Sequence, residues 1–315
     1  MLNIIQKGML TTIQDLGRRG YQRYGVPVSG AMDWFAASLA NILVGNGMNT
    51  PLLEVTVIGP VIETTEDCCF AVTGATFSPK LNGQPVPMNS CIHASAGSRI
   101  EMGFAALGTR GYIAFGGGFD IPLDMGSAST YIKARLGGLN GGPLQNGDAI
   151  PVRYKEYPAN LAERQAPPRI VPDYSASPIV RIVTEMSTGY FADNAVAMLT
   201  SECYTVSADS DRMGCRLEGP AIPYAGGCDG NIISDGIAIG SIQVAGRRPI
   251  VLMADRQTTG GYTKIGAVIM ADLPLVAQLK PSEKLRFEVT CLGDAQAAYG
   301  AMRVALSELD RRINL

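Results

Sequence analysis

Asp255 marks an abrupt change in the chain, from four apolar residues at 251–254 to a polar loop. The loop offers hydrogen-bonding side chains, two glycines and an aromatic ring: Gln257, Thr258, Thr259, Gly260, Gly261 and Tyr262. A buried strand that ends in a carboxylate and a glycine-rich loop is a common way to present a site. The same residues also fit a hairpin corner, in which Asp255 caps a turn and the glycines adopt positive φ. The residues alone leave both interpretations open.

A second cluster of charged residues lies near the start of the chain. Asp15, Arg18, Arg19 and Arg23 share a glycine-rich loop, and Asp33 follows closely. Guanidinium groups bind carboxylates and phosphates through paired hydrogen bonds, so this loop could hold an anion. A solvated turn with weak ion pairs is the alternative, and on the residues alone we favour it.

Two further segments place polar groups beside glycines. In 126–130, the hydroxyls of Ser127, Ser129 and Thr130 follow a glycine-rich stretch. Backbone amides of such a loop can surround an anion, although a polar linker fits equally well. In 210–214, Asp211 and Arg212 are neighbours. Neighbouring side chains on a strand point to opposite faces, so these two can face one cleft only if the segment forms a turn.

Several kinds of chemistry are excluded by the composition. The chain has a single histidine, His93, and no Cys-x-x-Cys pair, so we expect no zinc site. His93 lies in an alternating, strand-like segment, which favours a structural role over a Ser-His-Asp triad. No P-loop is present. The net charge of -2 argues against a nucleic-acid binder, which would normally carry a basic face.

The sequence is typical of a cytoplasmic protein. No apolar run approaches the roughly 18 residues of a membrane span, and the first residues lack the pattern of a signal peptide. The odd number of cysteines, seven, favours reduced thiols.

Short strands and tight turns are expected throughout, because the chain combines 37 glycines and 19 prolines with only 17% charged residues. Residues 4–14 fit a short strand and turn. Strand patterns occur at 53–58, 70–73, 99–103, 111–115, 179–183 and 251–254, with an Asn-Gly hairpin turn at 82–83. Helices are predicted at about 32–44, capped by Ser29 or Asp33, near 188–198, and at 294–312. We therefore predict a mainly β protein with a few helices.

A proline-rich stretch divides this pattern into two lobes. The predicted first lobe covers 1–155, a linker with several prolines covers 156–178, and the second lobe covers 179–315 and ends in the predicted helix.

Ordered motifs along the whole chain match a known family. They are Thr12-Ile-Gln-Asp-Leu-Gly-Arg18, Gly25-Val-Pro-Val-Ser-Gly-Ala-Met-Asp33, Leu39-Ala-Asn41, Gly126-Ser-Ala-Ser-Thr130, Ser210-Asp-Arg-Met-Gly214, Gly240-Ser-Ile-Gln243, Gln257-Thr-Thr-Gly-Gly-Tyr262, Ala277-Gln-Leu279 and Leu285-Arg-Phe287. On these motifs the chain resembles the KipA-type proteins, which are the C subunits of 5-oxoprolinase, of the biotin-dependent carboxyltransferase (allophanate hydrolase subunit 2) group. In one departure, Pro143 stands where the family usually has an arginine after Gly-Gly.

The resemblance implies two cyclophilin-like β-barrel lobes without prolyl isomerase activity. It also implies a subunit of an ATP-dependent complex that opens 5-oxo-L-proline to L-glutamate. The expected partners in that complex are a KipI-type protein and a LamB/YcsF-type protein, and the complex is expected to bind ATP with Mg²⁺.

Site residues are assigned on these motifs as hypotheses. Asp255 and Asp15 are the candidate catalytic residues, and no dedicated metal ligands are assigned, although Asp255 could also ligate magnesium. Arg18 and Arg212 are expected to bind a carboxylate or phosphate. The remaining substrate-binding candidates are Asp33, Asp211, Gln243, Gln257, Thr258, Thr259, Gly260, Gly261 and Tyr262, and the cofactor-binding candidates are Ser127, Ser129 and Thr130.

Two alternatives remain open on the sequence. The first is carboxyl transfer to a urea-like amide, with carboxybiotin from another chain, because this chain has no Met-Lys-Met biotinylation motif. The second is a non-catalytic role as the regulatory partner of a KipI-type kinase inhibitor.

Overall fold

The chain folds into two compact units. A computed structural model describes residues 1–153, 164–184 and 189–314. The first unit comprises Met1–Arg18, Ser29–Asp173 and Met302–Leu315, and the second comprises Arg19–Val28 and Tyr174–Ala301. Each unit is described below by itself.

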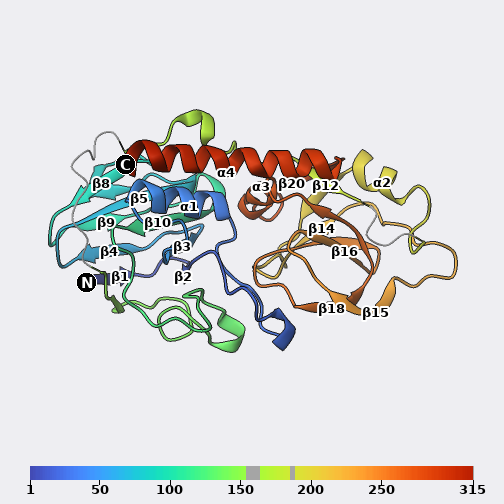
Figure 1. Cartoon of the computed structure of the whole chain (residues 1–315), viewed down its shortest axis with the longest axis horizontal. Helices are drawn as coiled ribbons and strands as arrows, with labels where there is room; N and C mark the ends of the chain where they lie inside the picture. The colour runs from blue at the N-terminus through green and yellow to red at the C-terminus, as the bar shows by residue number, and fades with distance from the viewer. Residues whose placement is uncertain (154–163, 185–188, 315) are drawn as a thin grey trace. The chain divides into compact units, whose positions relative to one another are not determined.

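Two antiparallel sheets build the first unit (Figure 1). The six-stranded sheet has the order β11(Ala149–Ile150), β1(Leu2–Gln6), β4(Val61–Thr64), β9(Arg99–Glu101), β6(Lys80–Leu81) and β7(Gln84–Pro85). The five-stranded sheet has the order β2(Leu10–Gln14), β3(Leu52–Thr56), β10(Leu107–Phe115), β5(Cys68–Thr76) and β8(Cys91–Ala94). Among the described residues, the 3-10 turns η2(Ile132–Ala134) and η4(Pro168–Ile170) belong to the first unit, and η1(Gln22–Tyr24) belongs to the second.

Helix α1(Trp34–Leu43) belongs to the first unit and contacts β5 and β10. It begins at Asp33, whose side chain accepts a hydrogen bond from the backbone N–H of Ala36. Its nine residues from Phe35 to Leu43 are buried, so the helix is apolar on nearly every side. The last turns of the C-terminal helix α4(Leu292–Asn314) add Leu306 and Leu309 to the same core.

A closed seven-stranded barrel forms the second unit (Figure 1). Around the barrel its strands are β12(Ile179–Val183), β19(Lys264–Val268), β16(Ser241–Ala245), β17(Arg248–Leu252), β14(Gly214–Glu218), β13(Cys203–Val206) and β20(Lys284–Val289). A separate two-stranded ribbon pairs β15(Asn231–Gly236) with β18(Thr259–Tyr262). The helices of this part are α2(Ala195–Ser201), α3(Leu273–Gln278) and the first turns of α4.

The mainly β prediction is confirmed. The Asn-Gly turn also occurs as predicted: Asn82 and Gly83 join β6 to β7 with φ of 51° and 80°. The helix expected near 188–198 begins later, at Ala195, and residue 188 lies outside the described part of the chain.

The unit boundaries differ from the predicted ranges. Residues 19–28 lie in the predicted first lobe but belong to the second unit. Residues 302–315 lie in the predicted second lobe but belong to the first unit. Composition locates a linker, but it carries no signal that a segment leaves one unit to join the other. Within the predicted linker, residues 164–173 belong to the first unit and residues 174–178 to the second, and residues 156–163 lie outside the described part of the chain.

Candidate functional site

A buried ion pair joins Arg212 to Asp255 in the second unit. The Arg212 Nε lies 2.9 Å from Asp255 Oδ2, and its Nη2 lies 3.1 Å from Oδ1. The two side chains are only 10% and 8% exposed. This is a two-point guanidinium–carboxylate contact, a geometry that fixes the orientation of both planes.

Sheet pairing brings these two residues together. β14 pairs with β17 from Gly214 opposite Leu252. Beyond the strand ends the pairing continues, because the Met253 N–H donates to the Met213 carbonyl and the Asp255 N–H donates to the Arg212 carbonyl. This backbone hydrogen bonding therefore positions the Asp255 carboxylate next to the Arg212 side chain.

Asp211 has a separate role in the same segment. Its Oδ1 accepts hydrogen bonds from the backbone N–H groups of Met213 (2.8 Å) and Gly214 (3.2 Å). The segment is thus a turn, in which Asp211 holds the backbone. The turn conformation leaves the neighbouring Arg212 side chain to pair with Asp255.

Two of the substrate-binding candidates, Gln243 and Gln257, contact each other in the second unit. The Gln257 Nε2 donates to Gln243 Oε1 over 3.1 Å. Gln243 is 2% exposed, and no group of the described residues accepts a hydrogen bond from its Nε2. A Cβ placed on Gly260 would lie 2.7 Å from that nitrogen, so the glycine allows the close approach of ribbon and barrel.

The ribbon strand β18 carries the outer part of this predicted set. Thr259 and Tyr262 are exposed, whereas Thr258, Gly260 and Gly261 are half-buried. The Thr258 carbonyl accepts a hydrogen bond from the Ile237 N–H. Residues 257–262 therefore run from the buried ion pair towards solvent.

Sequence reasoning missed Arg256, which follows Asp255 directly. It is buried, and its guanidinium donates to the carbonyls of Ile237 (3.3 Å) and Met253 (3.2 Å). Burial, and secondarily the charge of Arg19, lower the pKa of Arg256 to about 10. Its position beside the polar loop was the one available signal.

Lys264 on β19 is a second missed residue. Its Nζ is buried and lies 2.8 Å from Asp235 Oδ2 on the ribbon. Hydrogen bonding to Lys264 holds the pKa of Asp235 below its usual value. This contact ties the ribbon to the barrel.

Asp15 in the first unit is fully occupied by its own loops. Its Oδ1 accepts from the hydroxyls of Ser127 and Ser129 and from the Gly17 N–H, and its Oδ2 accepts from the Ala128 N–H. The carboxylate therefore organises the 126–130 loop from within. Its predicted catalytic role stays a prediction.

Arg18 is completely buried beside the same loop. Its Nε donates to the Asp124 carbonyl over 2.9 Å, and its Nη2 donates to the Ser129 carbonyl over 3.0 Å. Its Nη1 is buried and has no acceptor among the described residues. Because the guanidinium has no access to solvent, the site as described supports a loop-bracing role.

Thr130 and Asp33 are also used within the first unit. The Thr130 hydroxyl donates to the Ile13 carbonyl, and Asp33 caps α1. The Asp33 N–H donates to the Tyr112 hydroxyl, which donates to Glu54. Burial is the main cause that raises the pKa of Tyr112 well above its usual value, and the negative charges of Glu54 and Asp33 raise it further.

Apart from Asp33, which caps α1, the predicted site residues form two groups, one in each unit. Asp15 gathers Arg18, Ser127 and Ser129 around one loop, with Thr130 next to them. The second group consists of Asp211, Arg212, Gln243, Asp255, Gln257, Thr258, Thr259, Gly260, Gly261 and Tyr262. In the described part of the chain, no cluster of three histidine, cysteine or acidic side chains could hold a metal ion.

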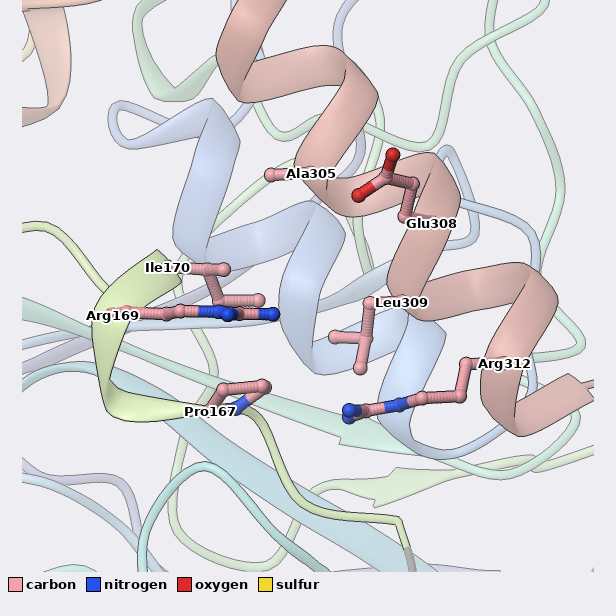
Figure 2. A pocket seen from close by; sticks show the side chains of 7 residues that line it. All are labelled: Pro167, Arg169, Ile170, Ala305, Glu308, Leu309 and Arg312. Atoms are coloured by element: carbon pink, nitrogen blue, oxygen red, sulfur yellow. The ribbon is translucent and has the colours of Figure 1, made fainter.

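A separate pocket of about 300 Å³ lies in the first unit between η4 and α4 (Figure 2). It is lined by Pro167, Arg169, Ile170, Ala305, Glu308, Leu309 and Arg312. None of the predicted site residues lines it. Among the described helices, none is long and apolar enough to cross a membrane.

The chain is thus a mainly β protein whose seven-stranded barrel carries a buried Arg–Asp pair and a contact between two glutamine amides. Residues 24–289 match the family described as carboxyltransferase domain, subdomain A and B. The chain belongs to this family.

Known proteins resemble the chain along its whole length. The C subunit of 5-oxoprolinase from Haemophilus influenzae is 33% identical over 315 residues, covering 100% of this chain and 99% of that protein. The C subunit of 5-oxoprolinase from Escherichia coli is 34% identical over 299 residues, covering 95% and 94%.

The fold is also found inside a larger enzyme. The crystal structure of K. lactis urea amidolyase superposes with a TM-score of 0.92 at 29% identity. The match covers 98% of this chain and 20% of that protein, so the chain spans about a fifth of it.

Proposed function

We propose that this chain is one component of an ATP-dependent 5-oxoprolinase complex, which opens 5-oxo-L-proline to L-glutamate. The observation that carries this proposal is end-to-end similarity to two proteins that are each named as the C subunit of 5-oxoprolinase. A KipI-type protein and a LamB/YcsF-type protein would be the other components, and a cytoplasmic location is part of the proposal.

The chemistry requires an activated lactam, because an amide carbonyl is a poor electrophile. As a co-substrate, ATP would transfer its γ-phosphoryl group to the carbonyl oxygen and leave as ADP. One water would then add to the carbonyl carbon, and the ring C–N bond would break with a proton going to the departing nitrogen. A second water would hydrolyse the resulting acyl phosphate to glutamate and inorganic phosphate. Fixed donors and cations are needed wherever negative charge develops. The second unit offers fixed donors in the Gln243–Gln257 pair, and it offers a guanidinium at Arg212 whose charge is balanced by Asp255.

We assign to Asp255 the role of orienting or deprotonating the water molecule that acts as the nucleophile. A carboxylate has about four acceptor sites, and Arg212 fills one on each oxygen. The remaining sites can orient a water molecule or accept its proton. Gln257, half-buried at the edge of the ribbon, would position the ring amide through its carbonyl oxygen.

The predicted cofactor residues do not fit a phosphate. The hydroxyls of Ser127 and Ser129 already donate to Asp15, and Thr130 donates to a backbone carbonyl. A phosphate oxygen needs donors, and these three are taken. We therefore assign the binding of ATP and Mg²⁺ to the complex and to no residue of this chain.

Reconstitution tests the proposal. The chain is co-expressed with its KipI-type and LamB/YcsF-type partners, and glutamate formed from 5-oxoproline is measured with and without ATP. The expected result is ATP-dependent glutamate that disappears when this chain is left out. Assembly of all three proteins without glutamate would contradict the proposal and favour a regulatory role.

A pair of matched variants tests the assignment of Asp255. Asp255→Asn keeps the size of the side chain and removes its charge, so turnover should fall by at least about a hundredfold if it acts as a base. Asp209→Asn makes the same change at an exposed position of the second unit and should leave turnover unchanged. Full turnover by Asp255→Asn in an assembled complex would refute the assignment.

Carboxyl transfer is the second candidate, and the similarity to urea amidolyase favours it. It would need carboxybiotin from another chain. The decisive measurement is the carboxylation of urea by bicarbonate and ATP in the presence of a biotin carboxylase and its biotinylated carrier, with and without this chain. Dependence of that product on the chain would establish the second candidate.

A further inference from the structure

The pocket between η4 and α4 is built on the packed core of the first unit. Leu309 on its floor is buried and belongs to a core cluster, and Ile170 packs against the same cluster. Pro167 and Ala305 complete the apolar lining. The floor of this pocket has a fixed shape, because the core residues beneath it are close-packed.

Two arginines stand on opposite walls of this pocket. Arg169 comes from η4 and Arg312 from the last turns of α4, and both side chains extend inward across the opening (Figure 2). Arg312 makes one long hydrogen bond, 3.4 Å from its Nη2 to the Gln165 carbonyl. Both side chains are exposed.

Among the residues that line the pocket, no acidic group neutralises this pair of cations. Glu308 is one of the lining residues, but its carboxylate points away from both guanidinium groups (Figure 2). Within the described ranges, no ion pair is formed by either arginine. The two positive charges repel each other beside an apolar floor. A bound anion would attract both guanidinium groups and so offset this repulsion.

We propose that this pocket binds a small organic carboxylate that carries an apolar body. The two guanidinium forks match the oxygens of a carboxylate, and the apolar body would cover Ile170 and Leu309. At roughly 30 Å³ for each water-sized group, the volume of about 300 Å³ suits a ligand of about ten non-hydrogen atoms. The site is independent of the proposed 5-oxoprolinase function.

The apolar floor decides between this ligand and a bare anion. Inorganic phosphate would contact the two arginines and leave Ile170 and Leu309 exposed to water. Each CH₂ group that is buried on binding contributes about 0.8 kcal/mol of favourable binding free energy. A branched aliphatic carboxylate should therefore bind more tightly than phosphate. A neutral amide of the same shape would lose the charge-assisted hydrogen bonds.

Binding of three probes to the free chain tests the proposal. By calorimetry or ligand-observed NMR we expect saturable binding of 4-methylpentanoate. Binding of 4-methylpentanamide and of inorganic phosphate should be weaker by about tenfold or more. Binding of the carboxylate should also weaken as the salt concentration is raised from about 0.05 to about 0.5 M. Equal binding of the acid and the amide would overturn the proposal.

Matched variants locate the binding. Arg169→Gln and Arg312→Gln should each weaken binding of 4-methylpentanoate by about tenfold. Arg311→Gln removes the same charge from the neighbouring exposed position, which does not line the pocket, and should change the affinity by less than about twofold. An equal effect of Arg311→Gln, or no effect of the two pocket variants, would refute the site.

The same titration in the assembled complex separates a small ligand from a protein segment. Binding that persists in the complex supports the proposal. Binding that is lost on assembly, with assembly weakened by Arg169→Gln, would show that a partner chain fills the pocket and would overturn it. Because the measurement uses no glutamate assay, its failure is distinct from failure of the 5-oxoprolinase proposal.

Discussion

Arg212 and Asp255 form a two-point ion pair between segments that are 43 residues apart in the chain. The strands β14 and β17 bring them together, and a backbone hydrogen bond between the same two residues fixes the spacing. A ligand that approaches this site therefore meets a neutralised pair rather than an isolated carboxylate.

Removal of one member of this pair should be costly. Asp255→Ala removes the two-point carboxylate contact from a buried guanidinium, and Arg212→Met removes the same contact from a buried carboxylate, so each should lower the free energy of unfolding by about 3–5 kcal/mol. The double variant should lose much less than the sum, because no buried charge is left alone. Chemical denaturation of the four proteins measures the coupling.

An exposed pair of the same chemistry provides the control. Arg153 and Asp120 form an ion pair on the surface of the first unit, 3.2 Å between Nε and Oδ1. Its coupling free energy should be below about 1 kcal/mol. A coupling at Arg212 and Asp255 no larger than this would contradict the buried ion pair.

The sequence predicted local structure well where one segment determines it. Asp33 caps α1, and Asn82-Gly83 makes a hairpin turn, because each needs only a few neighbouring residues. The apolar run 251–254 was expected to be a strand, and β17 ends at Leu252, two residues earlier.

Contacts between distant segments could not be read from the sequence. Nothing in the order of residues shows that Asp15 accepts hydrogen bonds from a loop 112 residues later, or that Arg212 selects Asp255. The pocket with Arg169 and Arg312 was missed for the same reason, since its walls come from segments more than a hundred residues apart. Such groupings depend on topology and not on local patterns.

The Asp15 loop gives a second prediction. Asp15→Asn replaces an oxygen that accepts hydrogen bonds by a donor, so at least one of its four hydrogen bonds must break. We expect the free energy of unfolding of the first unit to fall by about 2–3 kcal/mol. Asp120→Asn, at an exposed position where only the surface ion pair with Arg153 is lost, should change it by less than about 1 kcal/mol. Equal stabilities would show that the loop does not depend on the carboxylate.

Gly260 gives a third prediction, at the junction of ribbon and barrel. A methyl group there would lie 2.7 Å from Gln243 Nε2 and 3.1 Å from Ile237 Cδ1. Gly260→Ala should therefore displace the Gln243 amide and speed hydrogen exchange in β18 by about tenfold. Gly236→Ala, on the paired strand, meets nothing within 4 Å and serves as the control. Unchanged exchange in Gly260→Ala would contradict the described packing.

Arg164 gives a fourth prediction, because one buried guanidinium serves the ends of two helices. It donates to the carbonyls of Ile42 and Leu43 at the end of α1 and to the Ile313 carbonyl at the end of α4. Arg164→Lys keeps the charge but cannot reach all these acceptors, so unfolding should become easier by about 2–4 kcal/mol. Arg153→Lys is the exposed control. Loss of hydrogen-exchange protection confined to the last turns of α1 and α4 would show that the lost hydrogen bonds to the two helix ends cause the destabilisation.

The cysteines give a fifth prediction, on chemical reactivity. Burial, helped by the neighbouring Cys69, raises the pKa of Cys68 to about 12, so at pH 8 only about one molecule in ten thousand carries the reactive thiolate. Cys91 is buried, and its pKa is raised too, through its hydrogen bond to Cys69 and through burial. Brief treatment with iodoacetamide at pH 8 should modify the exposed Cys203 and Cys291 and spare Cys68 and Cys91. Below its pKa, the fraction of Cys68 present as thiolate rises tenfold for each pH unit. The rate of Cys68 modification should therefore increase about tenfold per pH unit above pH 8. Peptide mass spectrometry measures each site, and early labelling of Cys68 at pH 8 would contradict its described environment.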